Sequence, residues 1–254
     1  MLFQSFITTA LFAALSAGFP IETPEVDIIE NDVNTTVSEL DARATFQDVY
    51  KMYTGDGSHF KAGWPNMDFW GTWDQMWNAN VPLMRKSCGW NGWGKDNSET
   101  EIGYIKSSLV TVSGEVGIDK RFLLAIVMQE SKGCVRVPTT PSGSGHNNPG
   151  LMQSHAGKGT CAGVSNCSKA QVLLMIRDGS AGTSAGDGLK QTFAKTKAYI
   201  GSSGSQALYA AARMYNSGSV DYKNLNNGFI SNKCYVVDVA NRLTGWTSAA
   251  SKCS

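Results

Sequence analysis

Apolar side chains recur at helical spacing after residue 98. The positions that set this spacing are Ile102, Ile105, Leu109 and Val112. Asn97 or Ser98, followed by acidic residues, suits the N-terminal cap of such a helix. The pattern predicts a helix that begins near residue 99 and is broken at Gly114 and Gly117.

A second apolar segment, KRFLLAIVMQES, covers residues 120–131. Asp119 can cap its start and Gly133 can follow its end, so we expect another helix. The apolar positions on one face of this helix are Leu123, Ile126 and Val127. Glu130 is the next position on the same face. Burial and the negative end of the helix dipole both raise the pKa of a carboxyl group there, as a general acid requires.

The helix alone leaves another interpretation of this glutamate open. Glu130 could be a structural residue that Lys132 or Arg136 neutralises. It could also turn outward at a frayed helix end. The spacing of the apolar residues does not separate these possibilities.

Residues 138–167 are rich in Pro, Gly, Ser and Asn, which indicates a long loop or a small hairpin. Long loops inside a compact domain are usually functional. Helical patterns resume at residues 169–177, 188–200, 205–215 and 233–243. With 254 residues and 42% hydrophobic side chains, the chain can bury a sizeable core. We expect a mainly α domain over residues 99–254.

Residues 46–98 form a Trp-rich N-terminal extension that holds six of the seven tryptophans. Trp70, Trp73 and Trp77 share one helical face, and we expect them to pack against the rest of the protein. The other three are flanked by Gly, Pro or Asn and are candidates for exposed rings that stack on a sugar: Trp64, Trp90 and Trp93.

The first 45 residues differ in composition from the rest. Residues 1–18 are apolar and end in small residues, which predicts a signal peptide, with an N-terminal membrane anchor as the alternative. Residues 19–45 hold seven acids and one arginine, which predicts a pro-segment or linker. The remaining body has 21 basic and 14 acidic residues, a charge of +7 that favours an anionic partner.

Six cysteines follow the leader and none forms a C-x-x-C motif. In a secreted protein they indicate three disulfides, whose pairing the sequence leaves open, although Cys161 and Cys167 could close a small loop. Asn34 and Asn166 are candidate glycosylation sites on the same route. We therefore expect an extracellular protein, and a monomer.

Three short motifs occur in a fixed order: LLAIVMQES at 123–131, NPGLMQS at 148–154 and AARMYNSG at 211–218. Together they resemble the lysozyme-like domain of soluble lytic transglycosylases and goose-type lysozymes. The resemblance covers roughly residues 99–245. It implies a lysozyme-like fold and cleavage of the β-1,4 bonds of bacterial peptidoglycan, or of a chitin-like glycan.

The resemblance also implies roles for single residues. Glu130 is the general acid, and Ser131 helps to hold it or the sugar. The backbone of Gly150, Leu151 and Met152 lines a cleft together with Gln153. Tyr215 forms a hydrogen bond near the glutamate, and Asn216 contacts the N-acetyl sugar.

Two departures from the family affect the mechanism. The Trp-rich segment and the cysteines are additions, and no Asp or Glu lies between Glu130 and Asp178, where goose-type lysozymes are expected to place aspartates. A single carboxyl group favours a transglycosylase. Another acid could still fold beside Glu130 and give a hydrolytic muramidase; the candidates are Asp68, Asp74, Asp178 and Asp187. A binding protein or effector without activity is the third possibility.

Other chemistries find little support in the sequence. Residues 182–186 spell G-x-S-x-G, but all three histidines precede that serine, so the order of an α/β-hydrolase is absent. His146 and His155 lack further ligands nearby, and no nucleotide-binding motif occurs. We expect no metal and no cofactor. The scattered basic residues argue against nucleic acid, and we expect no stable membrane insertion.

Overall fold

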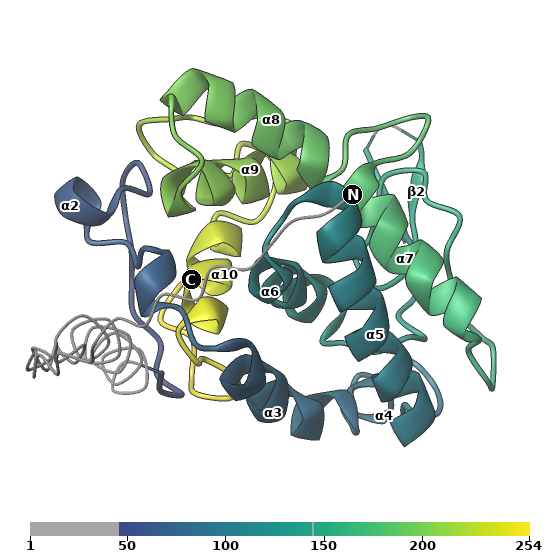
Figure 1. Cartoon of the computed structure of the whole chain (residues 1–254). Helices are drawn as coiled ribbons and strands as arrows, with labels where there is room; N and C mark the ends of the chain where they lie inside the picture. Colours follow the sequence, from purple (N-terminus) through teal and green to yellow (C-terminus); the bar gives the residue numbers. More distant parts are fainter. Residues whose placement is uncertain (1–45, 144) are drawn as a thin grey trace, which may run out of the picture. The chain divides into compact units, whose positions relative to one another are not determined.

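Helix α6 (Lys120–Ser131) lies at the centre of the helices that the structure describes (Figure 1). The computed structural model describes residues 46–143 and 145–254, which belong to one compact unit spanning Ser38–Ser254. The predicted leader, the acidic segment and the Asn34 site lie outside the described residues.

The described chain is mainly helical, so the predicted α class is confirmed. Before α6 come α2 (His59–Ala62), the 3-10 helix η1 (Met67–Phe69), α3 (Trp73–Met84), α4 (Ser87–Trp90) and α5 (Glu99–Val116). After α6 come β1 (Thr140–Pro141), β2 (Asn147–Asn148), α7 (Lys169–Ala181), α8 (Leu189–Ile200), α9 (Ser205–Ser217) and α10 (Tyr235–Leu243). The two short strands pair antiparallel and form the hairpin alternative predicted for the long loop.

The caps of α5 and α6 follow the sequence closely. Ser98 accepts a hydrogen bond from the backbone of Glu101, whose side chain accepts one from the backbone of Ser98, which completes a capping box. Asp119 caps α6 through the backbone N–H of Arg121. The predicted break at Gly114 is wrong: α5 continues to Val116, and the left-handed residue that ends it is Gly117.

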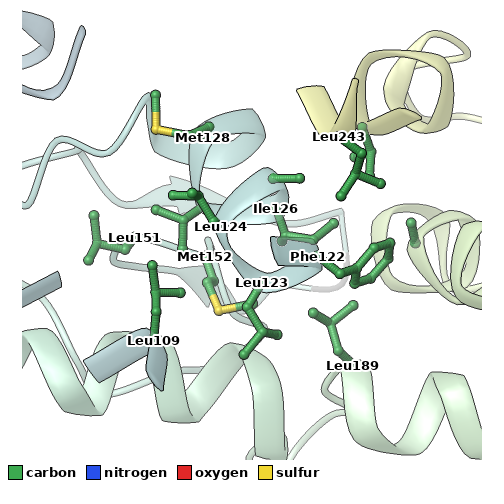
Figure 2. Packing of buried hydrophobic residues seen from close by; sticks show 14 of the residues in the cluster. Leu109, Phe122, Leu123, Leu124, Ile126, Met128, Leu151, Met152, Leu189 and Leu243 are labelled. Atoms are coloured by element: carbon green, nitrogen blue, oxygen red, sulfur yellow. The ribbon is translucent and has the colours of Figure 1, made fainter. Parts of the chain in front are cut away.

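Helix α6 is buried on nearly every side, which explains its almost unbroken apolar sequence. It packs against α3, α5 and α10. Figure 2 shows its side chains among residues of α5, the loop before α7, α8 and α10. All five α6 side chains labelled in Figure 2 are fully buried: Phe122, Leu123, Leu124, Ile126 and Met128. Burial of each such side chain stabilises the fold by about 1.5–3 kcal/mol, so packing anchors α6 in the core.

The tryptophans of residues 46–98 lie mostly inside the same core. Trp70 and Trp77 are buried as expected, but α3 begins only at Trp73, so Trp70 lies outside the helix. The prediction that Trp64 is an exposed sugar-stacking ring is wrong, because it is 0% exposed. Its ring packs against Tyr209 and its indole N–H donates to the carbonyl of Thr54, so the flanking Gly and Pro residues indicate a turn and not exposure.

Three disulfides link the described cysteines. They join Cys88 to Cys134, Cys161 to Cys167 and Cys234 to Cys253. The second pair closes the small loop that its spacing had predicted. The first ties α4 to the chain just after α6, and the third ties the C-terminal tail to the start of α10.

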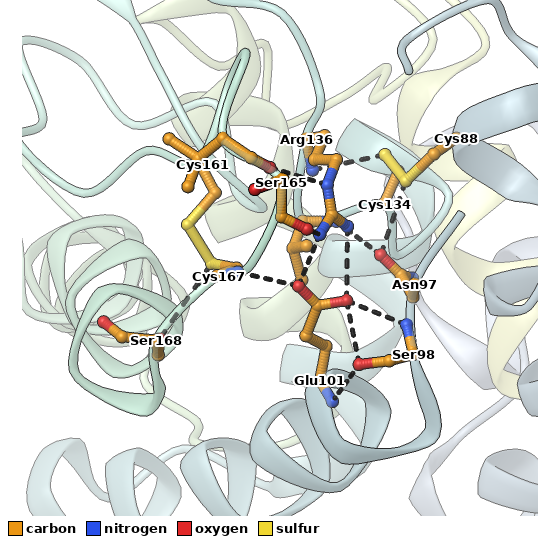
Figure 3. A network of polar contacts seen from close by, with 12 residues as sticks. Cys88, Asn97, Ser98, Glu101, Cys134, Arg136, Cys161, Ser165, Cys167 and Ser168 are labelled. Carbon is orange, nitrogen blue, oxygen red and sulfur yellow. Dashed lines mark hydrogen bonds and ion pairs between the residues drawn. A yellow bond between two sulfur atoms is a disulfide. The ribbon is translucent and has the colours of Figure 1, made fainter. Parts of the chain in front are cut away.

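A buried ion pair fixes the segment that follows α6. Arg136 donates to both carboxylate oxygens of Glu101, at 3.2 and 2.6 Å, and both side chains are almost fully buried (Figure 3). Burial alone raises the pKa of Glu101, but the hydrogen bonds from Arg136, Ser98 and Cys167 outweigh it and hold that pKa below its ordinary value. The structure therefore rejects Arg136 as the residue that neutralises Glu130.

Candidate active site

Glu130 lies in the last turn of α6, on the face that the pattern predicted, and is partly buried. Burial raises its pKa from 4.5 to about 7, against the opposing effects of a hydrogen bond from Tyr235 and the charge of Lys132. The Tyr235 hydroxyl donates to Oε1 of Glu130 at 2.5 Å. The carboxyl group is thus accessible in part and can exchange a proton near neutral pH.

Tyr235 is the residue of this site that the sequence reasoning missed. It begins α10, directly after the disulfide-bonded Cys234, and it is only 3% exposed. Its own pKa is raised well above 10 by burial and by the neighbouring Glu130, so the phenol keeps its proton and acts as a donor. A tyrosine in an apolar helix needs a partner for its hydroxyl, which could have marked the residue but not identified the glutamate.

Tyr215 lies within electrostatic reach of the glutamate, and its hydrogen bond is made to the neighbouring loop. Its hydroxyl donates to the backbone carbonyl of Met152 at 2.8 Å. Burial raises its pKa well above 10, and the charges of Glu130 and Asp178 raise it further. A side chain at Gly179 would approach the Tyr215 hydroxyl to 2.8 Å, so glycine makes room for this contact. Tyr215 therefore fixes the loop beside the site.

That loop, residues 150–153, is partly buried. The side chains of Leu151 and Met152 are 0% exposed, so only their backbone could line a binding surface. Gly150 has φ +75°, and a Cβ there would lie 2.5 Å from the carbonyl oxygen of Gly159. Gln153 also has positive φ, and its amide bonds to Thr140, Pro138 and Gly150. Its side chain thus braces the loop and stays partly exposed, so the predicted place of Gln153 in the cleft lining stays a prediction.

Ser131 departs from its predicted role, whereas the predicted role of Asn216 stays open. Ser131 is fully buried; its hydroxyl donates to the Val127 carbonyl and accepts from the Gly133 backbone, so it neither contacts Glu130 nor reaches a sugar. Asn216 remains partly exposed in the last turn of α9, with Oδ1 bonded to Arg213. Asn216 can therefore still meet a ligand.

The two remaining candidate tryptophans differ in exposure. Trp90 is 70% exposed, with the Lys86 ammonium 5.1 Å from its ring centroid, whereas Trp93 is only partly exposed. Neither contacts Glu130. Trp90 thus remains available to stack on a ligand, outside the immediate surroundings of the carboxyl group.

No second carboxylate bonds to Glu130 among the described residues. Asp178 accepts the backbone N–H groups of Lys158 and Gly159 through Oδ2, and Asp187 pairs with Lys195. Asp68 and Asp74 are exposed and lie in the first turns of η1 and α3. Of these four acids, Asp178 alone acts on a residue that Glu130 also affects: the charges of both raise the pKa of Tyr215.

A polar cluster adjoins Glu130 on the side of α10. Asp238 accepts hydrogen bonds from Tyr50 and Gln129, and Arg242 donates to Gln129. Lys132, in the left-handed conformation that ends α6, lies within electrostatic reach of this cluster. Burial and Arg242 lower the pKa of Lys132 to about 8, against the charges of Asp238 and Glu130. Lys132 therefore modulates the carboxyl group without an ion pair to it.

Other features lie apart from this site. A hollow of about 420 Å³ lies between α3 and α5 and is lined by Trp77, Ile102 and their neighbours. Neither Glu130 nor Tyr235 lines it. The rings of His146 and His155 are 4.7 Å apart, but within residues 46–143 and 145–254 no three acidic, Cys or His side chains gather as a metal site requires. None of the described helices is both long and apolar enough to cross a bilayer.

Comparison with known proteins adds no relative. Models of known protein families give no match to the chain, and no curated protein matches it. The family therefore remains a prediction that rests on the three sequence motifs.

Proposed function

We propose that the chain is a secreted enzyme that cleaves the β-1,4 bonds of peptidoglycan with one catalytic carboxyl group, Glu130. The observation that carries the proposal is the state of this side chain: partly exposed, bonded to one hydroxyl and with a pKa of about 7. Near neutral pH such a group can both give and take a proton, as general acid–base catalysis requires. The three motifs supply the substrate class.

The reaction needs two proton transfers at the same carboxyl group. Glu130 gives its proton to the glycosidic oxygen, the bond from that oxygen to the anomeric carbon breaks, and the leaving sugar departs with a free 4-hydroxyl. The carboxylate then takes the proton of the muramyl 6-hydroxyl, whose oxygen bonds to the anomeric carbon. Glu130 regains its proton, and no water is consumed. The Tyr235 hydroxyl stabilises the carboxylate between the two steps.

The surroundings of Glu130 favour this route over hydrolysis. An inverting hydrolase needs a second carboxylate about 6.5–9.5 Å away to activate water, and a retaining one needs a nucleophile at about 5–5.5 Å. Three of the candidate acids are exposed or paired elsewhere. Asp178 supports the hydrolytic alternative, because its charge and that of Glu130 both act on Tyr215.

Digestion of purified peptidoglycan in ¹⁸O-labelled water tests the proposal. We expect 1,6-anhydromuramyl ends without label, detected by mass spectrometry, and no products from Glu130→Gln. Labelled reducing ends that disappear in Asp178→Asn would establish the hydrolytic version instead. Chitin oligomers, run in parallel, define the glycan.

A protein that binds walls without cleaving them is the second candidate. The exposed Trp90 with Lys86 over its ring supports it, because an aromatic face and a cation suit an anionic glycan. Wild-type protein that sediments with walls but releases no fragment would establish this role. Weaker sedimentation of Trp90→Ala would then locate the binding surface.

A further inference from the structure

Arg213 links two residues of the candidate site. It lies on α9 and is 0% exposed. Its two terminal nitrogens donate to the Asn232 carbonyl, each at 3.0 Å, and one of them also donates to Oδ1 of Asn216. The guanidinium carbon lies 5.8 Å from the ring centroid of Tyr235, whose hydroxyl reaches Glu130. Arg213 therefore contacts both Asn216 and the donor to the catalytic carboxyl group.

The burial of this cation is not compensated by an acid. Arg136, the comparable buried arginine, pairs with Glu101, whereas no carboxylate in the described part of the chain pairs with Arg213. Within residues 46–143 and 145–254, Nε of Arg213 finds no hydrogen-bond partner, and burial lowers the pKa of the side chain. A buried cation without an acid is costly, so its contribution lies in the placement of the groups that it binds.

The contact with Arg213 fixes which end of the Asn216 amide faces outward. A guanidinium has only N–H donors and no acceptor, so the amide atom that faces it must be the oxygen. The opposite orientation would set the amide NH₂ group against the donors of Arg213. Nδ2 of Asn216 has no partner among the described residues, and the side chain is partly exposed. Asn216 thus presents donors, not an acceptor.

We propose that Arg213 is a positioning residue for substrate selection, which holds the Asn216 amide with its N–H donors toward the bound glycan. The enzyme then selects a sugar that presents a carbonyl oxygen at this point, as an N-acetyl group does. The inference rests on the proposed function, since it takes the glycan to bind beside Glu130. Asn216 makes the contact, and Arg213 acts through it.

Binding to two tetrasaccharides, one N-acetylated and one de-N-acetylated, tests the inference by calorimetry. All variants carry Glu130→Gln, so that the acetylated sugar stays intact. With Arg213 and Asn216 present, we expect the deacetylated sugar to bind at least about tenfold more weakly, the effect of losing one hydrogen bond. The charge of its free amines affects every variant, so the comparison is made between their affinity ratios.

Two substitutions remove the selection by different means. Asn216→Leu keeps nearly the same shape, removes the N–H donors and adds no charge that would attract the free amines, and we expect the affinity ratio to fall to about twofold or less. Arg213→Met releases the amide and should lower the ratio similarly, while Arg213→Lys retains part of it. Arg136→Lys is the matched control, a buried arginine without contact to Asn216, and should leave the ratio unchanged.

The outcomes separate this inference from the proposed function. A folded Arg213→Met protein with an unchanged ratio would reduce Arg213 to a structural residue. Should that variant fail to fold, an unchanged ratio in Asn216→Leu would overturn the inference by itself. Cleavage by the wild-type chain without any acetyl selection defeats the inference alone. Selection in the binding assay without cleavage by the wild-type chain defeats the proposed enzyme but leaves the role of Arg213.

Discussion

Glu101 and Glu130 are both glutamates, but their surroundings shift their pKa values in opposite directions. Glu101 lies in the first turn of α5 and accepts hydrogen bonds from Arg136, Ser98 and the Cys167 backbone, which hold its pKa below the ordinary value. Glu130 lies in the last turn of α6, where Tyr235 is its only hydrogen-bond donor among the described residues, and burial raises its pKa to about 7. The dipole of each helix acts in the direction of the net shift: it lowers the pKa of Glu101 at a helix N-terminus and raises that of Glu130 at a helix C-terminus.

Burial alone therefore does not produce a general acid. Glu101 is the more buried of the two, yet its donors and its cation keep it ionised. Glu130 has too few donors to compensate for the water that it has lost. The difference between a structural and a chemical glutamate lies in the number and charge of the partners.

Removal of the titrating proton of Glu130 should have the largest effect on cleavage. Glu130→Gln keeps the shape of the side chain but cannot titrate, and we expect peptidoglycan cleavage to fall by about 10²–10⁴-fold or more. Release of soluble muropeptides measures this. Wild-type rates in this variant would refute the catalytic role, and a circular dichroism spectrum like that of the wild type is the control for folding.

The matching change at the other glutamate should affect stability instead. Glu101→Gln leaves the buried Arg136 without its acid, and we expect a loss of about 3–5 kcal/mol in the free energy of unfolding, measured in urea. Glu115→Gln is the control, because its pair with Arg177 is exposed and contributes little. Equal effects of the two substitutions would show that burial of the Glu101 pair does not matter.

The helices and the position of Glu130 were predictable because both follow local rules. Apolar spacing and caps at Ser98 and Asp119 fix α5 and α6, and the same spacing places Glu130 on the buried face. Gly114 shows the limit: a glycine inside a helix weakens it, but packing of the whole helix overrides that preference. The spacing of Cys161 and Cys167 was likewise local information.

The partners of Glu130 depend on contacts between residues distant in sequence. Tyr235 is 105 positions away, and only the packing of α10 against α6 brings the two together. The burial of Trp64 against Tyr209 and the pairing of Arg136 with Glu101 have the same origin. A single sequence contains no signal for which distant side chain fills a given position.

The two glutamates should give stability opposite dependences on pH. The pKa of Glu101 is lowered by folding, so its contribution is present above the ordinary pKa and is lost as the pH falls. The pKa of Glu130 is raised from 4.5 to about 7, so its contribution is present below pH 4.5 and is lost as the pH rises through 7.

The size of the Glu130 contribution is roughly 3 kcal/mol, by conversion of that change in pKa. Between pH 4.5 and pH 9, Glu130→Gln should therefore gain up to this amount relative to the wild-type chain. Urea unfolding of both proteins across this range measures it. Parallel stability curves would mean that Glu130 titrates as an ordinary exposed glutamate.

The smallest effect is expected from Tyr235→Phe, which removes the hydroxyl that donates to Glu130 and leaves the ring in place. The hydrogen bond from Tyr235 lowers the pKa of Glu130, so its loss should raise that pKa above 7. Activity that depends on the protonated acid falls as the pH rises through this pKa, and the alkaline limb of the pH–rate profile should therefore move to higher pH. The maximal rate should fall as well, because the carboxylate formed during the reaction loses its donor.

Tyr50→Phe is the matched control for Tyr235→Phe. It removes a hydroxyl that bonds to Asp238, which lies on α10 as Tyr235 does, and not to Glu130. A limb that stays in place in Tyr235→Phe, or that moves equally in Tyr50→Phe, would mean that the contact of Tyr235 with Glu130 does not set the acidity of the site.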